Sequence, residues 1–140
     1  MTLIVLNFKT YRESTGEQAV RLAGICEDIS REYAVQMVVV PQVADISAVA
    51  SAVKIPVFAQ HVDGVGFGGF TGHVTAASLA GAGAKGSLIN HSERRLKLAE
   101  IEASISACRQ AGLKSIICTN NVATTRAAAA LQPDWVAVEP

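Results

Sequence analysis

Short apolar segments recur along the chain and predict six buried β-strands. Within each segment apolar residues largely follow one another instead of alternating with polar ones. That pattern is typical of parallel strands covered on both faces. The six segments span residues 3–6, 37–40, 57–59, 86–89, 115–118 and 135–138.

Helical patterns alternate with these segments. Ser14 and Glu17 have the spacing of a capping box at the start of the first helix. On that helix we expect one apolar stripe, formed by Leu22, Ile25, Cys26 and Ile29. The predicted helices span residues 17–32, 45–52, 75–82, 98–112 and 121–131, and a long glycine-rich loop spans residues 61–72.

Repeated strand–helix units leave two architectures open, a doubly wound open sheet and a (β/α) barrel. At 140 residues the chain has room for one domain with a sizeable core. Both architectures place their chemistry at the carboxyl ends of the strands. Polar residues cluster at those ends, which predicts a functional site there; they are Asn7, Lys9, Gln60, His61, Asn90, His91 and Glu139.

Composition excludes several classes of protein. Twelve basic residues balance twelve acidic ones and only 17% of residues are charged, which argues against nucleic-acid binding and against disorder. Because no apolar run approaches about 18 residues, we expect no membrane span. The chain enters a strand at once, without the features of a signal peptide. The three cysteines lie in apolar segments, so we expect buried free thiols and a cytoplasmic location.

His91 occupies a distinctive position between the fourth strand and a short helical turn expected from Ser92. Free backbone N–H groups and the positive end of a helix disfavour a protonated ring. A neutral imidazole could then donate a hydrogen bond to a substrate oxygen. On position alone, a loop histidine without a role is the competing interpretation.

Other motifs favour structural interpretations. The glycines between Gly64 and Gly69 do not form a GxGxxG motif that opens a helix, so they do not indicate a nucleotide site. His61 and His73 lack further metal ligands at a recognisable spacing, and we expect no metal ion. Arg94 and Arg95 resemble a basic patch that binds phosphate. We expect one of them to form a structural salt bridge instead.

Four blocks in register resemble the triosephosphate isomerase family, and details such as INHSERR, FAQHVD and TGHV resemble its compact archaeal branch. The blocks span residues 7–9 (NFK), 69–72 (GFTG), 90–95 (NHSERR) and 136–140 (VAVEP). The resemblance covers the whole chain, which corresponds to the N-terminal part of such a protein, from its start through strand six. It implies an incomplete (β/α)8 TIM barrel of the α/β class, with about six of the eight units in one partial domain over residues 1–140.

The resemblance also implies roles for individual residues. Glu139 matches the base that moves a carbon-bound proton, and His91 matches the group that polarises the substrate carbonyl. Lys9 matches the lysine that supports negative charge, and Asn7 matches the asparagine that positions that lysine and the substrate. Glu93 matches a second carboxylate and a plausible partner for Lys9. In a separate part of the chain, Thr71 matches the tip of a loop that reaches a neighbouring subunit.

The implied activity is interconversion of dihydroxyacetone phosphate and D-glyceraldehyde 3-phosphate, in glycolysis and gluconeogenesis, by a homo-oligomer (dimer or tetramer) without a cofactor. A full barrel needs about 200 residues or more, and its phosphate site is usually built after strands seven and eight. This sequence stops after strand six. We therefore expect a partial sequence that is nearly inactive alone.

Two alternatives remain open from the sequence. Another phosphate-using barrel enzyme, such as an aldolase or an indole-pathway isomerase, would need a Schiff-base lysine at a strand end. The lysines in the region of strands two to six fall elsewhere, at Lys54, Lys85, Lys97 and Lys114. The other alternative is a non-catalytic half-barrel module that folds by pairing with a complementary chain.

Overall fold

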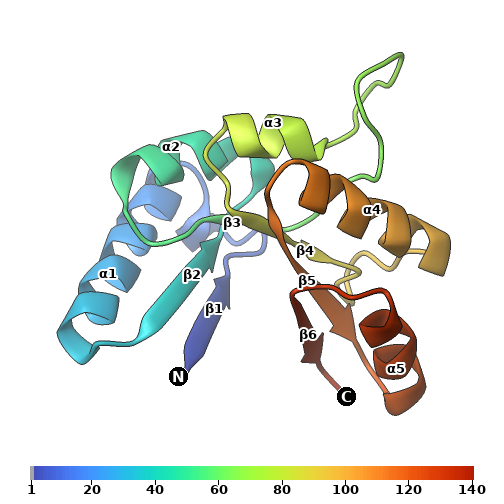
Figure 1. Cartoon of the computed structure of the whole chain (residues 1–140). Coiled ribbons are helices and arrows are strands. Elements are labelled where there is room, and N and C mark those ends of the chain that lie inside the picture. The colour runs from blue at the N-terminus through green and yellow to red at the C-terminus, as the bar shows by residue number, and fades with distance from the viewer. Residues whose placement is uncertain (1) are drawn as a thin grey trace.

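A computed structural model describes residues 2–140 and contains six strands, as the sequence predicts. Each predicted apolar segment lies within one residue of an observed strand (Figure 1). The strands are β1 (Leu3–Asn7), β2 (Gln36–Val40), β3 (Phe58–Ala59), β4 (Gly86–Ile89), β5 (Lys114–Thr119) and β6 (Trp135–Val138).

The helices follow the strands in alternation and lie on the outer side of the arc of strands (Figure 1). All five predicted helices are present with boundaries within two residues of the prediction. They are α1 (Glu17–Tyr33), α2 (Ile46–Ala52), α3 (Ala76–Gly81), α4 (Leu98–Gln110) and α5 (Val122–Ala130), together with two 3-10 turns, η1 (Arg12–Ser14) and η2 (Val43–Asp45).

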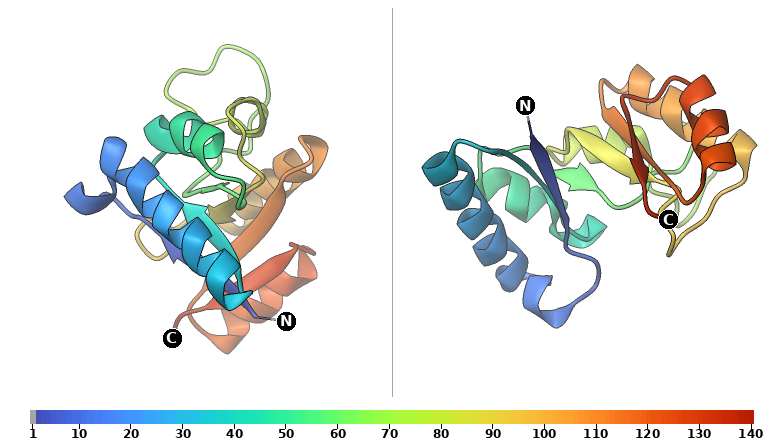
Figure 2. Two further views of the ribbon diagram at one scale, coloured as in Figure 1. Left: turned by 90° about the vertical axis from the view of Figure 1, so that its left-hand side faces the viewer. Right: turned by 90° about the horizontal axis from the view of Figure 1, so that it is seen from below.

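All strand pairings are parallel and connect strands in chain order. β1 pairs with β2, and β3, β4, β5 and β6 pair in sequence. A bridge between Val39 and Val57 joins the two groups. A doubly wound sheet would reverse its strand order, whereas these strands proceed around an arc with β1 and β6 at its ends (Figure 2). The fold is therefore a partial TIM barrel, and among the described residues β1 and β6 each have one neighbouring strand.

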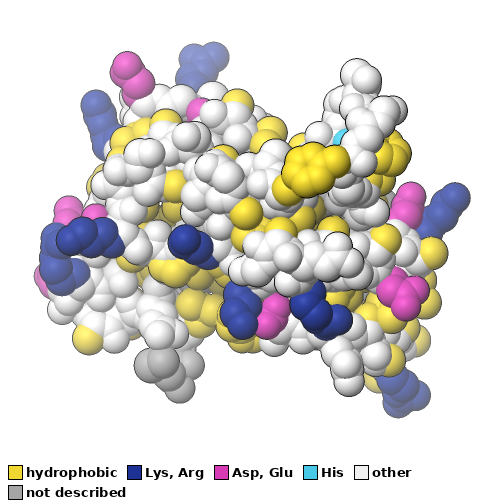
Figure 3. Space-filling view, turned by 45° about the horizontal axis from the view of Figure 1, so that its top comes forward, with side chains coloured by type: hydrophobic (Ala, Val, Ile, Leu, Met, Phe, Trp, Pro, Cys, Tyr) yellow, Lys and Arg dark blue, Asp and Glu magenta, His cyan; other side chains and the backbone are white. Residues whose placement is uncertain are grey.

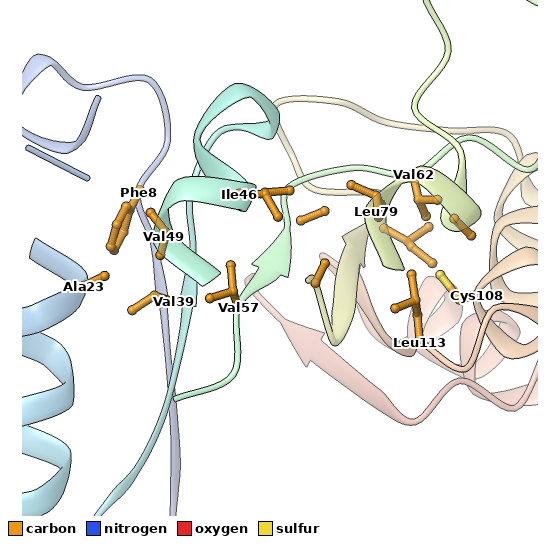
Figure 4. Packing of buried hydrophobic residues seen from close by; sticks show 14 of the residues in the cluster. Phe8, Ala23, Val39, Ile46, Val49, Val57, Val62, Leu79, Cys108 and Leu113 are labelled. Carbon is orange, nitrogen blue, oxygen red and sulfur yellow. The ribbon is translucent and has the colours of Figure 1, made fainter. Parts of the chain in front are cut away.

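The main core fills the space between the arc of strands and the helices (Figure 4). Val39 on β2, Ile89 on β4 and Ile117 on β5 belong to this core and are completely buried. A second cluster lies on the inner side of the strands, formed by Val38, Val40, Phe58, Leu88 and Ile116. β2, β3, β4 and β5 are buried along most of their length, as their uninterrupted apolar segments predict. The same prediction is wrong for β1 and β6, which are partly exposed because each has a neighbouring strand on one side only among the described residues.

The capping box expected at the start of α1 is wrong. Gly16 is the N-cap residue and offers no side-chain cap. The Ser14 hydroxyl instead donates to the carbonyl of Phe8 at 2.6 Å, within the 3-10 turn that connects β1 to α1. This bond links the 3-10 turn η1 to the chain just after β1.

The apolar stripe predicted on α1 is only partly correct. Cys26 is buried, but Ile25 and Ile29 are 53% and 40% exposed. Ala19 and Ala23 form the buried face in their place. Small side chains let α1 approach the strands closely, and the larger isoleucines are displaced to its flank.

The three cysteines are buried free thiols, as expected. Burial raises the pKa of the Cys108 thiol to about 12, and the nearby negative charge of Asp134 adds to the effect. Burial likewise raises the pKa of Cys26 and Cys118. These thiols are core residues and not candidate nucleophiles.

Within residues 2–140, none of the helices has the length and apolar character that crossing a membrane requires.

Gly86, at the start of β4, packs against Phe58 of the inner cluster so closely that there is no room for a side chain. A Cβ there would lie 2.5 Å from Cε2 of Phe58 and 2.7 Å from the carbonyl oxygen of Lys114. We predict that Gly86→Ala lowers the free energy of unfolding by about 1–3 kcal/mol through overpacking, measured by urea denaturation.

Gly24→Ala is the matched control, because a Cβ at Gly24 in α1 meets no atom within 4 Å. That change should stabilise the chain by about 0.5–1 kcal/mol, since alanine is the better helix former. Equal effects of the two substitutions would contradict the packing assigned to Gly86.

Candidate active site

A cavity of about 240 Å³ opens at the carboxyl ends of β1, β3 and β4. The parallel register brings the loops that follow these strands to the same rim of the arc. Every residue around the cavity carries a polar side chain, and the set is Asn7, Lys9, Thr10, Gln60, His61, His91, Glu93 and Arg94.

Lys9 is held in a left-handed backbone conformation with φ of 50°. The side-chain oxygen of Asn7 accepts a hydrogen bond from its N–H at 3.0 Å, and the amide of Gln60 donates to its carbonyl at 2.9 Å. Two amide side chains therefore fix the backbone of Lys9 from both sides. Among the described residues no carboxylate lies within 4.0 Å of its ammonium group, so its charge is available to a ligand.

His91 is the second residue after β4 and lies in a turn closed by a hydrogen bond from the N–H of Arg94 to the His91 carbonyl at 2.7 Å. The short helical turn expected from Ser92 is present as this single hydrogen-bonded turn, and no helix follows it before α4. A single backbone N–H, that of Glu93, points at Nδ1 of the ring at 3.1 Å. Because Nδ1 accepts this bond, the proton of the neutral imidazole lies on Nε2.

The His91 turn is anchored to the neighbouring strand by Asn90 and Arg95. Nδ2 of Asn90 donates to the carbonyl of Cys118 at 3.0 Å. Nη1 of Arg95 donates to the carbonyls of Asn90 and Cys118 at 2.7 and 3.2 Å. Within the described part of the chain neither Arg94 nor Arg95 forms an ion pair within 4.0 Å, so the expected structural salt bridge is wrong. Backbone carbonyls take the place of a carboxylate.

The structure places four of the six predicted site residues around this cavity: Asn7, Lys9, His91 and Glu93. Glu93 is exposed and forms no ion pair with Lys9 within 4.0 Å. The other two lie outside the cavity lining. Glu139 is exposed just after β6, where its N–H donates to the carbonyl of Thr119 at 2.8 Å. It therefore lies at the same carboxyl rim of the strands. Thr71 is an exposed residue of the glycine-rich loop.

The loop that contains Thr71 projects beyond α3 and α4 (Figure 1). In the space-filling view it rises from the surface and carries exposed hydrophobic side chains (Figure 3). Two of these are Phe67, 94% exposed, and Phe70, 52% exposed. The segment is thus an exposed arm that carries two aromatic side chains on its surface.

Asp63 closes the neck of this arm. Its carboxylate accepts hydrogen bonds from Nε2 of His61 and from the N–H of Val74, each at 2.7 Å, and Nδ1 of His73 lies 3.6 Å away. Burial alone would raise the pKa of Asp63. The bonds from Val74 and His61, with the nearby imidazoles, outweigh burial and lower that pKa below its ordinary value.

His61 and His73 therefore face a shared carboxylate that the sequence interpretation did not connect to them. Among residues 2–140, no group of three or more histidine, cysteine, aspartate or glutamate side chains is arranged to hold a metal ion. The role visible for this cluster is to shape the arm and to orient His61 at the cavity wall.

Gln60 follows β3 and is one of the polar residues at strand ends that the sequence predicts to form a site, and it lines the cavity. The sequence did not connect Asp63 or Arg94 to the site. Asp63 at the start of a glycine-rich loop gives a weak signal, since aspartate at such positions often accepts backbone N–H bonds. Nothing local in the sequence distinguishes Arg94, which lines the cavity, from Arg95, which does not.

Comparison with known proteins gives consistent matches. The family model described as triosephosphate isomerase matches residues 2–138. The triosephosphate isomerases of Methanococcoides burtonii and Methanosarcina acetivorans are 59% and 58% identical to the chain over 138 and 137 residues. These matches cover 99% and 98% of this chain but 62% of each relative, so the chain spans less than two thirds of their length.

A solved structure agrees with the sequence matches. The crystal structure of triosephosphate isomerase from Bartonella henselae matches with a TM-score of 0.82 at 26% sequence identity. The match covers 99% of this chain and 67% of that one.

We predict that Asp63→Asn loosens the neck of the arm. An amide has one oxygen and cannot accept the bonds of both His61 and Val74. Losing a hydrogen bond to a charged group, about 1.5–3 kcal/mol, should accelerate hydrogen exchange of the Val74 N–H roughly ten- to a hundredfold. Asp28→Asn, on the exposed face of α1, is the control and should leave Val74 unchanged.

Lowering the pH tests the same hydrogen bond between Asp63 and Val74 without a substitution. Because the folded-state pKa of Asp63 is lowered from 3.8, its stabilisation is present above that value and is lost as pH falls through the lower folded value. Protection of Val74 should therefore persist at pH 5 and decline below about pH 4. If neither Asp63→Asn nor acid changes the hydrogen-exchange protection of the Val74 N–H, Asp63 does not hold the neck of the arm.

Proposed function

The chain belongs to the triosephosphate isomerase family, and on this premise we propose that it supplies most of the active site of an enzyme that interconverts dihydroxyacetone phosphate and D-glyceraldehyde 3-phosphate. The observation that carries the proposal is one cavity that holds Asn7, Lys9, His91 and Glu93 at the carboxyl ends of β1 and β4. A lysine and an Nε2-protonated histidine at one cavity suit the binding of an anionic carbonyl substrate.

In the proposed mechanism the carboxylate of Glu139 removes a proton from C1 of dihydroxyacetone phosphate. The electron pair of the broken C–H bond forms the C1–C2 double bond, and the carbonyl oxygen becomes an enediolate oxygen. The hydroxyl proton then passes from the oxygen on C1 to the oxygen on C2. Glu139, now a carboxylic acid, returns its proton to C2, which yields the aldose. One carboxylate can serve both carbons because they are adjacent.

His91 and Lys9 stabilise the charge that develops in this reaction. Nε2 of His91 bears the ring proton and donates it as a hydrogen bond to the carbonyl oxygen, because Nδ1 is occupied by the N–H of Glu93. The ammonium of Lys9, on a backbone held by Asn7 and Gln60, supports the negative charge of substrate and enediolate. Glu93, at the same cavity, acts as the second carboxylate and moderates the local positive charge.

We propose that residues 1–140 by themselves are nearly inactive. Barrel enzymes of this architecture usually hold the substrate phosphate with loops after strands seven and eight. The cavity itself offers Lys9 and Arg94 as cations for an anionic substrate. Residues 1–140 then act as one partial-barrel domain of a cytoplasmic, cofactor-independent enzyme of glycolysis and gluconeogenesis.

An oligomer is part of the proposal. The arm with Thr71, Phe67 and Phe70 is the surface that would reach a second copy of the chain, in a dimer or a tetramer. Its exposed aromatic side chains support this assignment.

The second candidate function is a non-catalytic half-barrel module. The observation that favours it is the open edge at each end of the arc, where Ile4, Leu6 and Val138 are 42%, 37% and 52% exposed. Such edges are templates for pairing with a further polypeptide. An aldolase-like alternative is not supported, because the chain belongs to the isomerase family.

We predict isomerase activity when the chain is joined to the C-terminal third of the Methanococcoides burtonii relative, and little or none from residues 1–140 alone. A coupled assay for interconversion of the two triose phosphates measures both. Activity in neither protein, with the joined chain folded, would favour the half-barrel module over the enzyme.

In the joined protein, Glu139→Asp should lower kcat by roughly 10²–10³-fold with little change in KM, because the shorter carboxylate misplaces the base. Glu32→Asp at the exposed end of α1 is the matched control and should leave kcat unchanged. Unchanged turnover in Glu139→Asp would remove Glu139 from the mechanism.

His91→Gln should also lower kcat by roughly 10²-fold or more, since a neutral imidazole donor at the carbonyl is lost. Circular dichroism and thermal unfolding of the same variant should match those of the unmodified protein, because His91 contributes no buried contact to the core. A folded variant with full activity would show that His91 is a loop histidine without a role in the reaction.

A further inference from the structure

We propose that Asn90 is the residue that positions His91, by maintaining a left-handed backbone conformation at the point where the chain leaves β4. The inference rests on the function proposed above, in which His91 presents Nε2–H to the substrate. It assigns to Asn90 no contact with substrate and no part in proton transfer.

The backbone provides the first observation. Asn90 has φ of 64°, a region that ordinary L-residues avoid and that asparagine tolerates best after glycine. Ile89, the residue before it, is completely buried and paired with Ile117 in the sheet. A residue in extended conformation at position 90 would carry His91 onward along the strand direction. The left-handed residue turns the chain so that His91 joins the cavity wall.

The Asn90 side chain provides the second observation. The residue is 4% exposed, and both ends of its amide are bonded. Nδ2 donates to the carbonyl of Cys118 at 3.0 Å, which ties the residue to β5. Oδ1 accepts from the N–H of Leu96 at 2.8 Å, which closes the far end of the turn. The amide therefore spans the His91 turn, and Arg95 adds a bond to the Asn90 carbonyl at 2.7 Å.

The consequence for His91 follows from the turn geometry. The N–H of Glu93 reaches Nδ1 of the ring only while residues 90–94 keep this turn. If Asn90 left the left-handed region, the peptide between Asn90 and His91 would rotate and that N–H would lose its acceptor. The ring proton would then be shared between the two nitrogens. The backbone conformation of Asn90 thus keeps the ring proton of His91 on Nε2.

The test compares Asn90→Gly with Asn90→Ala in residues 1–140. Both variants lose the amide and its bonds, so both should melt at lower temperature than the unmodified chain. Only glycine accepts a φ of 64° without steric cost. We expect the ¹⁵N NMR signals of the His91 ring to show protonated Nε2 and unprotonated Nδ1 in Asn90→Gly, as in the unmodified chain. Asn90→Ala should give averaged signals of mixed tautomers.

Gln132→Ala is the matched control for backbone strain. Gln132 has φ of 58° after α5, outside the cavity lining, so alanine there meets the same steric problem. This variant should melt lower and keep the His91 signals unchanged. If Asn90→Ala does not fold, Asn90→Ser replaces it, because serine also disfavours the left-handed region.

Two outcomes overturn the inference. One is His91 signals in Asn90→Ala, or in its serine substitute, identical to those of the unmodified chain. The other is equal loss of the tautomer in the glycine and alanine variants, which would assign the effect to the amide and not to the backbone conformation.

Activity of the joined protein separates this inference from the proposed function. Asn90→Ala should lower kcat roughly ten- to a hundredfold with KM nearly unchanged, and glycine should restore kcat to within about threefold of the unmodified protein. An inactive joined protein would refute the proposed function, while the NMR comparison would still decide whether Asn90 positions His91. An active protein with equal kcat in the alanine variant would overturn the positioning role alone.

Discussion

The parallel hydrogen-bonded ladder between neighbouring strands is the constraint on which the candidate site depends. It aligns Asn7 with Val40 at the end of β1, and Ile89 with Ile117 at the end of β4. The bridge between Val39 and Val57 joins the two halves of the arc. Because every strand runs in the same direction, the loops after β1, β3 and β4 open onto one rim. Lys9, far from His91 in sequence, reaches the same cavity only through this alignment.

On that rim, side-chain amides carry out most of the local positioning. Asn7 and Gln60 hold the two backbone polar groups of Lys9, and Asn90 spans the turn that presents His91. Both Lys9 and Asn90 adopt positive φ. Side-chain hydrogen bonds therefore fix the short turns that orient Lys9 and His91, and neither residue belongs to a helix. The site is thus organised by specific hydrogen bonds on a rigid scaffold, and charge is left free for a ligand.

The sequence predicts the scaffold far better than these local contacts. Strands such as β2 and β5 are recognisable because burial on both faces requires continuous apolar residues. The sequence indicates a turn at Ser92, but not that this turn ends without continuing into a helix. Ile25 and Ile29 have the correct helical spacing for a buried stripe, but Ala19 and Ala23 pack closer to the strands. The link between Asp63 and Val74 joins residues across a loop whose path no periodicity reveals. Residue types indicated the candidate site, whereas its geometry depends on which backbone groups each side chain reaches.

The proposed reaction depends on one carboxylate, Glu139, which moves a carbon-bound proton beside the cavity that holds Lys9 and His91. The decisive experiment is isomerisation by the joined protein in D₂O, followed by NMR of recovered dihydroxyacetone phosphate. We expect uptake of deuterium at one of the two C1 hydrogens only, because a single base faces one side of the substrate, and loss of this uptake in Glu139→Gln. Uptake at both hydrogens, or equal uptake in Glu139→Gln, would show that Glu139 is not the base.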